Sequence, residues 1–306
     1  MNAGHNALNL GIRGCRPKEL PAIVRRLDQE FIYSKQRRLS LGKRFSNTLS
    51  VENIEQIRVA VSEGEVRGAL AIRMFDWIVE ESVWHGAMIG MVWVDSQHRG
   101  RGFGSSLLSS TTQFLRDKGV DFGVLWTGNP AFYERAGWRL NDRSLFGEAV
   151  SRHASAFIDT VSCQPLVSVD ATRLERLRST SLSMRVVRSA LDYCTVPIPA
   201  AQVLCFFAEG NEGREGFALV GEQDGVGYFY EMIAGPSLWN AIWAAVTERF
   251  TRTLANGYSG DPFADWIAEN RLVAWRPQHK TMWLRISGRI KDHSIDAWNI
   301  PYYDWI

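Results

Sequence analysis

The feature that most constrains the fold is a glycine-rich segment, residues 99–104, between an apolar run and a helix-forming run. It reads Arg-Gly-Arg-Gly-Phe-Gly, with apolar residues 87–94 before it and residues 105–118 after it. A buried strand that ends in a tight glycine turn and opens a helix directs several backbone N–H groups at one point. Arg99 and Arg101 add positive charge there. We therefore predict a phosphate-binding turn, whose spacing is neither that of the P-loop nor that of the dinucleotide fingerprint.

Length and charge narrow the classes of function. The chain has 306 residues, enough for about two domains. Residues 1–150 hold 20 Lys and Arg against 16 Asp and Glu, whereas the remainder holds 15 against 17. This mild positive excess suits an anionic ligand but is far below that of a nucleic-acid-binding domain. The Arg-Gly-Arg-Gly segment also occurs once, unlike the repeated, disordered RGG segments that bind nucleic acids.

The cysteines and the apolar runs indicate the cellular setting. Cys15, Cys163, Cys194 and Cys205 show no CxxC pair and no metal-ligand spacing, so we expect free, mostly buried thiols and no metal site. The first nine residues do not resemble a signal peptide, and no apolar run approaches the roughly 20 residues of a membrane span. We expect a soluble, cytoplasmic monomer or homodimer that binds neither membranes nor nucleic acid.

The first half is predicted to alternate strands and helices. Residues 8–15 indicate a strand, and residues 17–31 a helix with apolar side chains at helical spacing. The basic stretch 35–47 is interpreted as a solvated loop or helix face, or as an edge of the ligand site. Strands at 57–62 and 66–78 precede the strand that ends at Val94, and another strand follows at 122–126. Asn129 and Pro130 open a short helix that Gly137 ends, and a strand from Trp138 to Phe146 is expected to close this unit.

The second half shows the same order of elements. After a connection at 147–170 we predict a helix at 171–192, an extended joint at 196–199, and strands at 203–208, 216–222 and 226–234. A helix from 237 to 254, another beginning at 261–262, and a final strand at 282–286 follow. Three antiparallel strands leading into a long helix repeat the order of residues 57–118, which indicates a degenerate internal duplication. The second copy has only Ala-Gly-Pro-Ser at 234–237 in place of the glycine-rich segment, so we expect one phosphate-binding site.

Two segments give the first half a resemblance to the Gcn5-related N-acetyltransferase (GNAT) family. Residues 94–104 match its coenzyme A signature, Arg/Gln-x-x-Gly-x-Gly, and residues 129–138 match its second signature. The resemblance covers roughly residues 8–146, and the second half looks like a diverged copy. It implies an α/β (α+β) chain of two GNAT-like domains, each a central mixed, mostly antiparallel splayed sheet flanked by helices. The implied division is a catalytic domain at 1–148, a linker at 149–170 and a degenerate domain at 171–306.

The resemblance also implies an activity. Members of the family transfer acetyl directly from acetyl-CoA, here the cosubstrate, to an amine, so the expected partners are coenzyme A and a primary amine of a small molecule or peptide. The alternative is a non-catalytic acyl-CoA sensor or partner-binding protein. The resemblance assigns coenzyme binding to these residues: Trp93, Val94, Arg99, Gly100, Arg101, Gly102, Phe103, Gly104, Ser105, Asn129, Phe132 and Tyr133. A backbone N–H near Trp93 or Val94 would stabilise the oxyanion that forms at the thioester carbonyl.

The sequence points to a general acid more clearly than to a general base. Tyr133 is the choice for general acid, because its place in the second signature puts it in the first turns of a helix. The alternative is a buried tyrosine that packs on Trp126. Glu81, His85 and Asp95 are weak candidates for the general base, since no motif distinguishes them.

The last residues, 298–306, are unusually aromatic for a terminus. We expect this tail to be docked, with packing across the junction between the halves as one possibility. Tandem members of the family offer a precedent for a C-terminus that reaches the active site.

Overall fold

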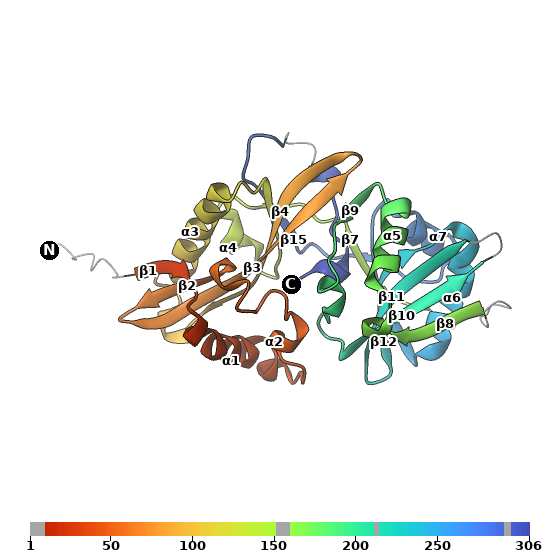
Figure 1. The fold of residues 1–306 in the computed structure, drawn as a ribbon, viewed down its shortest axis with the longest axis horizontal. Helices are drawn as coiled ribbons and strands as arrows, with labels where there is room; N and C mark the ends of the chain where they lie inside the picture. Colours follow the sequence, from red (N-terminus) through yellow and green to blue (C-terminus); the bar gives the residue numbers. More distant parts are fainter. Residues whose placement is uncertain (1–9, 151–159, 211–213, 291–294) are drawn as a thin grey trace.

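The computed structural model describes residues 10–150, 160–210, 214–290 and 295–306. Two mixed sheets form the two halves of the molecule, and the C-terminal end lies between them (Figure 1). The predicted α/β class, with two mixed, splayed sheets flanked by helices, is confirmed. Within the described ranges, no helix is both long enough and apolar enough to cross a membrane.

The first sheet consists mainly of strands from the N-terminal half. Its order is β1 (Leu10–Gly14), β2 (Ile57–Ser62), β3 (Glu65–Val79), β4 (Ser82–Val94), β5 (Phe122–Trp126), β15 (Thr281–Arg285) and β6 (Arg139–Leu140). A short strand β9 (Met184–Val186) pairs with the far end of β3. β4 and β5 are parallel, and the other pairs of this sheet are antiparallel.

The second sheet repeats this order. It runs β8 (Val161–Pro165), β10 (Gln202–Glu209), β11 (Glu215–Gln223), β12 (Val226–Ile233), β13 (Arg252–Tyr258), β7 (Ser144–Glu148) and β14 (Arg276–Pro277). Its one parallel pair, β12 with β13, corresponds to β4 with β5. The internal duplication predicted from the element order is therefore visible in the topology.

Besides β9, the two sheets exchange one long-range strand each. β15 lies between β5 and β6 in the first sheet, with Thr281 opposite Trp126. β7 takes the matching place in the second sheet, with Tyr258 opposite Ser144. The prediction of one strand at 138–146 that closes the first unit was wrong beyond Leu140, because β6 ends there at the edge of the first sheet and β7 joins the second. Asp142 accepts hydrogen bonds from Ser144 N and Thr281 Oγ1, and this turn directs β7 away from β6.

Helices cover both faces of each sheet. In the first half, α1 (Leu20–Phe31) and α2 (Leu41–Arg44) pack on one face, and α3 (Phe103–Asp117) packs on the other; α4 (Pro130–Glu134) follows β5. In the second half, α5 (Ala171–Ser181) and α6 (Pro236–Arg249) take opposite faces, and α7 (Pro262–Glu269) follows β13. The alternation of buried residues along β2 and β3 places successive side chains in the two cores.

Several boundaries differ from the predictions. The helix expected at 171–192 ends at Ser181, in a run of serine and threonine with low helix propensity, and the chain then forms β9. The helix expected to reach residue 254 ends at Arg249, because β13 begins at Arg252. The predicted linker, 149–170, lies partly outside the described residues, and its described part includes β8. All four cysteines are free, but Cys163 and Cys194 are exposed rather than buried.

Arg44 joins the two halves through a buried guanidinium. It is 1% exposed and donates to the carbonyl oxygens of Val196, Pro197 and Ala200 in the joint between the halves. Burial lowers the pKa of Arg44 to about 10. The interpretation of residues 35–47 as a solvated stretch was therefore wrong for this side chain.

A buried ion network also connects the halves and the C-terminal segment. Arg188 donates to both carboxylate oxygens of Asp304, at 2.9 and 2.7 Å, and to Glu231 of β12 at 2.6 Å. Arg73 of β3 donates to the backbone oxygen of Asp304 at 3.1 Å and lies 2.9 Å from Asp192. The side chains of Arg188 and Asp304 are fully buried. The network fixes the residues that follow Asp304 in the space between the sheets.

Candidate functional site

β4 and β5 separate at the centre of the first sheet. They pair only from Gly86 with Phe122 to Met88 with Val124, and then diverge. The remaining residues of β4 include a bulge, where the pairing with β3 shifts register and Met91 has a φ of 55°. A splayed pair with a bulge leaves backbone N–H and C=O groups of β4 available to an extended ligand. Trp93 and Val94 lie on this part of β4, as the sequence predicted.

The glycine-rich segment follows β4 after a short turn at residues 95–98 and leads into α3 at Phe103. Gly100 and Gly102 have φ values of 76° and 84°, a region that residues with a Cβ rarely adopt. A Cβ at either position would meet nothing within 4 Å, so the turn is open on its outer side. Phe103 is buried and anchors the helix, and Ser105 is exposed in its first turn. The structure thus brings an open turn, the N-terminus of a 15-residue helix and the diverging strand together.

The two arginines of the segment differ in their contacts. Arg99 Nε donates to the carbonyl oxygen of Val94 at 3.0 Å, and its Nη2 lies 3.0 Å from Glu30 of α1. Arg101 is exposed. The segment therefore carries one arginine tied to β4 and one directed to solvent.

Helix α4 packs against the glycine-rich segment. A Cβ at Gly104 would lie 3.0 Å from the ring of Phe132, so the glycine allows the close contact. Pro130 opens the helix and Gly137, with a φ of 86°, follows its end. Asn129 occupies the N-cap position, as its place in the sequence predicted. Its side chain, however, makes no capping hydrogen bond to the residues that the structure describes.

Tyr133 lies in the same apolar cluster as Val94 and Phe103. Its ring contacts Phe132 and Trp138 edge to face, with centroids 4.9 and 6.4 Å away, rather than the ring of Trp126. Burial raises the pKa of Tyr133 to about 12, while a hydrogen bond with Thr127 acts in the opposite direction. The phenol therefore stays protonated, and can donate, throughout the physiological range.

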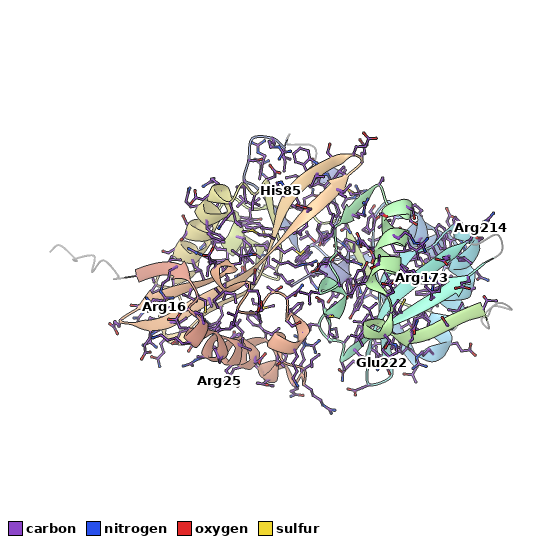
Figure 2. All side chains as sticks on the ribbon, in the orientation of Figure 1. Arg16, Arg25, His85, Arg173, Arg214 and Glu222 are labelled. Atoms are coloured by element: carbon purple, nitrogen blue, oxygen red, sulfur yellow. The ribbon has the colours of Figure 1, made fainter. Side chains whose placement is uncertain are left out.

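The three candidates for the general base lie apart. Glu81 is exposed at the turn of the β3–β4 hairpin, between Val79 and Ser82. His85 is exposed on β4 (Figure 2), and its Nδ1 lies 2.8 Å from Asp76 Oδ1. Asp95 accepts from Gln97 N and lies 3.4 Å from Arg67, and these contacts lower its pKa. Of the three, Asp95 alone adjoins the glycine-rich segment.

The C-terminal segment reaches the first sheet beside the splay. Trp305 stacks on Trp126 of β5, with centroids 4.6 Å apart and an angle of 20°. A Cβ at Gly90 of β4 would lie 2.6 Å from the backbone oxygen of Ile306, so only glycine allows this approach. Docking of the aromatic tail across the junction is confirmed. Gly90 was not predicted as a site residue, and its one signal in the sequence is that it is a lone glycine in an apolar strand.

Comparison with known proteins relates the first half to a sequence family and the chain to a fold. Residues 11–141 match the family model described as the acetyltransferase (GNAT) domain. No curated protein sequence matches the chain significantly.

Among solved structures, a GCN5-related N-acetyltransferase from Kribbella flavida is 20% identical, with a TM-score of 0.68 over 92% of this chain and 72% of that one. One from Anabaena variabilis ATCC 29413 is 14% identical, with a TM-score of 0.71 over 91% and 73%. A tandem GNAT protein from the clavulanic acid biosynthesis pathway is 11% identical, with a TM-score of 0.57 over 92% and 100%. At these identities the likeness concerns the fold.

Proposed function

Since residues 11–141 form an acetyltransferase domain of the GNAT family, we propose that this protein transfers acetyl directly from acetyl-CoA to a primary amine of a small molecule or peptide. One observation carries the proposal. The glycine-rich N-terminus of α3, the splayed end of β4 and the phenol of Tyr133 converge on one apolar cluster. These parts would hold a pyrophosphate, an extended amide chain and a thioester in that order.

The binding of acetyl-CoA is assigned to the backbone. N–H groups of residues 101–105 would bind the pyrophosphate, with Arg101 adding charge. Free backbone groups of β4 after Met88 would pair with the pantetheine amides, and Phe132 and Asn129 would border the same groove. An N–H of Trp93 or Val94 would stabilise the oxyanion at the thioester carbonyl.

Acetyl transfer forms one carbon–nitrogen bond, breaks one carbon–sulfur bond and needs a proton donor for the sulfur. The amine nitrogen forms a bond to the carbonyl carbon, the bond from that carbon to sulfur breaks, and the amine gives up a proton to solvent water, from which the Tyr133 phenolate regains the proton that it donates to sulfur. The Tyr133 hydroxyl would donate to the sulfur as negative charge develops on it. Because burial raises the pKa of Tyr133 to about 12, the phenol is available in its donor form at neutral and moderately basic pH.

The experiment that tests the proposal measures release of free thiol from acetyl-CoA with a panel of primary amines. Amine-dependent release, with the acetylated amine found by mass spectrometry, is the expected result. Binding of acetyl-CoA without release for any amine would contradict the proposal and favour the non-catalytic sensor.

Gly102 allows a direct test of the phosphate-binding turn. Gly102→Ala is expected to raise the KM for acetyl-CoA by about tenfold, because a Cβ at a φ of 84° costs roughly 1–2 kcal/mol and the turn relaxes. The kcat should change less than about twofold, since the residue is remote from the reacting atoms. Gly235→Ala is the matched control. Gly235 precedes α6 at the corresponding place in the second half, has a φ of −69° and has open space for a Cβ. An unchanged KM in Gly102→Ala would contradict the assignment.

A further inference from the structure

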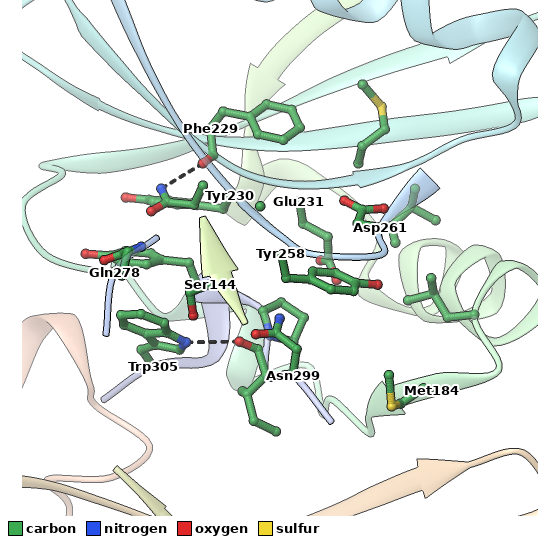
Figure 3. Close-up of a pocket in the computed structure, with 18 residues that line it drawn as sticks. Ser144, Met184, Phe229, Tyr230, Glu231, Tyr258, Asp261, Gln278, Asn299 and Trp305 are labelled. Carbon is green, nitrogen blue, oxygen red and sulfur yellow. Dashed lines mark hydrogen bonds between the residues drawn. The ribbon is translucent and has the colours of Figure 1, made fainter. Parts of the chain in front are cut away.

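The second sheet contains a small chamber at the point that corresponds to the splay of the first. Pairing of β12 with β13 ends at Phe229 and Ala255, and the two strands then diverge. Residues after these positions line a cavity of about 60 Å3, which the C-terminal segment closes from the side of the first sheet (Figure 3). Its polar lining consists of Ser144, Glu231, Asn256, Tyr258, Asp261, Gln278 and Asn299.

The chamber contains one carboxylate without a cationic partner in the described part of the chain. Glu231 is neutralised by Arg188 at 2.6 Å and Arg178 at 3.4 Å. Asp261 accepts only from the backbone at the start of α7, including Phe263 N at 3.2 Å. The nearby guanidinium of Arg143 donates instead to backbone oxygens, those of Ser259 and Ala297. Asp261 is therefore the carboxylate of the lining that no described guanidinium pairs with directly.

The side-chain amide of Asn299 is available to bind a ligand in the chamber. Asn299 lines the chamber, is only 7% exposed, and its side chain makes no hydrogen bond to any described residue. Figure 3 shows it near Tyr258, whose hydroxyl likewise has no hydrogen-bonding partner among the residues that the structure describes. Buried polar groups are normally hydrogen-bonded, so the amide of Asn299 is available to a ligand, and the half-buried Tyr258 lies beside the same space.

One residue, Trp305, contacts both the chamber and β5 of the first sheet. Trp305 lines the chamber on one side and stacks on Trp126 at the end of β5 on the other. A wider, open space of about 460 Å3 shares Asn256, Gln278 and Trp305 with the chamber and also includes Tyr302. The Trp305 ring therefore offers an apolar surface between the chamber and β5.

We propose that the chamber binds the far ammonium group of a linear diamine or polyamine whose other amine receives the acetyl group. This inference rests on the proposed function and specifies its acceptor. Asp261 is the counter-ion, and the oxygens of Asn299 and Tyr258 accept from the ammonium, which has three donors. The chamber has room for more than one water-sized group, and therefore for an ammonium.

The ionisation of Asp261 agrees with this role. Burial raises its pKa to about 6, with the charges of Asp265 and Glu231 contributing and the backbone N–H groups of α7 acting against them. The carboxyl is therefore mainly ionised at pH 7.5, and a bound ammonium would favour that form.

The test compares acceptors with and without a second amine. Thiol release is measured with 1,6-diaminohexane and with n-hexylamine, in the unchanged protein and in Asp261→Asn. Asparagine keeps the helix cap, so the fold is retained and only the charge is removed. We expect kcat/KM for the diamine to fall roughly 10- to 100-fold and that for the monoamine to stay unchanged. Glu269→Gln, at an exposed position at the end of α7, should change neither value. Asn299→Leu should lower the diamine value in the same direction.

Calorimetric titration with 1,6-diaminohexane separates this inference from the proposed function. Binding that Asp261→Asn weakens supports the chamber even if no amine is acetylated, which would overturn the proposed function alone. Equal kcat/KM for the diamine and the monoamine, unchanged in Asp261→Asn, would overturn the chamber while acetyl transfer stands.

Discussion

Replacing Tyr133 with phenylalanine is expected to lower the kcat of acetyl transfer by about 100-fold or more, with little change in the KM for acetyl-CoA. General acid catalysis contributes roughly 100- to 10,000-fold, and an interaction made only as the sulfur departs affects kcat rather than binding. Phenylalanine retains the edge-to-face contacts with Phe132 and Trp138, so the loss would report the hydroxyl and not the packing.

The pH dependence gives a second measurement on the same residue. Because the pKa of Tyr133 is raised to about 12, the protonated form persists, and kcat should show no decline from loss of this proton up to about pH 10. Tyr33→Phe, at an exposed tyrosine, is the control and should behave as the unchanged protein. Equal turnover in Tyr133→Phe would eliminate the acid role.

Replacing Asp304 with asparagine should lower the free energy of unfolding by about 3–5 kcal/mol, because it leaves buried guanidinium groups without their counter-charge. Chemical denaturation at pH 7 measures the change. Asp296→Asn, at an exposed position in the same segment, should remain within about 0.5 kcal/mol of the unchanged protein.

The difference in the free energy of unfolding between the unchanged protein and Asp304→Asn should become smaller in acid. The direction follows from the pKa of Asp304 in the folded protein. Contacts with Arg188 and Arg73 lower the pKa of Asp304 despite the opposing effect of burial. The stabilisation is therefore present in full above the ordinary pKa of a carboxyl, about 4, and is lost as the pH falls through the lower native value. A difference between the two proteins that grows in acid would contradict the network as the cause.

Local signals account for the parts of the site that the sequence located. Pro130 at the start of α4, Gly137 after its end, and the glycines at 100 and 102 act through their own backbone preferences. The same holds for the strand order 57–94, where turn residues separate apolar runs.

Distant pairing explains what sequence reasoning missed. β7 and β15 have ordinary strand patterns, and nothing in either indicates which sheet it joins. The hydrogen bond from Arg73 to Asp304 spans 231 residues, and Arg44 binds carbonyls more than 150 residues away. These contacts depend on the packing of the completed fold, so a periodicity within a short window cannot show them. The chamber at Asp261 likewise forms only when the C-terminal segment closes it.

The exchanged strands also affect how a ribosome can produce this protein. β5 is complete at Trp126, but its outer neighbour β15 is translated roughly 150 residues later, which takes about 10–30 s at usual rates. For that time the nascent N-terminal half has an open, apolar sheet edge, the kind of surface that chaperones shield and that promotes aggregation. Slowing translation after residue 126 should therefore lower the yield of folded protein more than slowing it after residue 285.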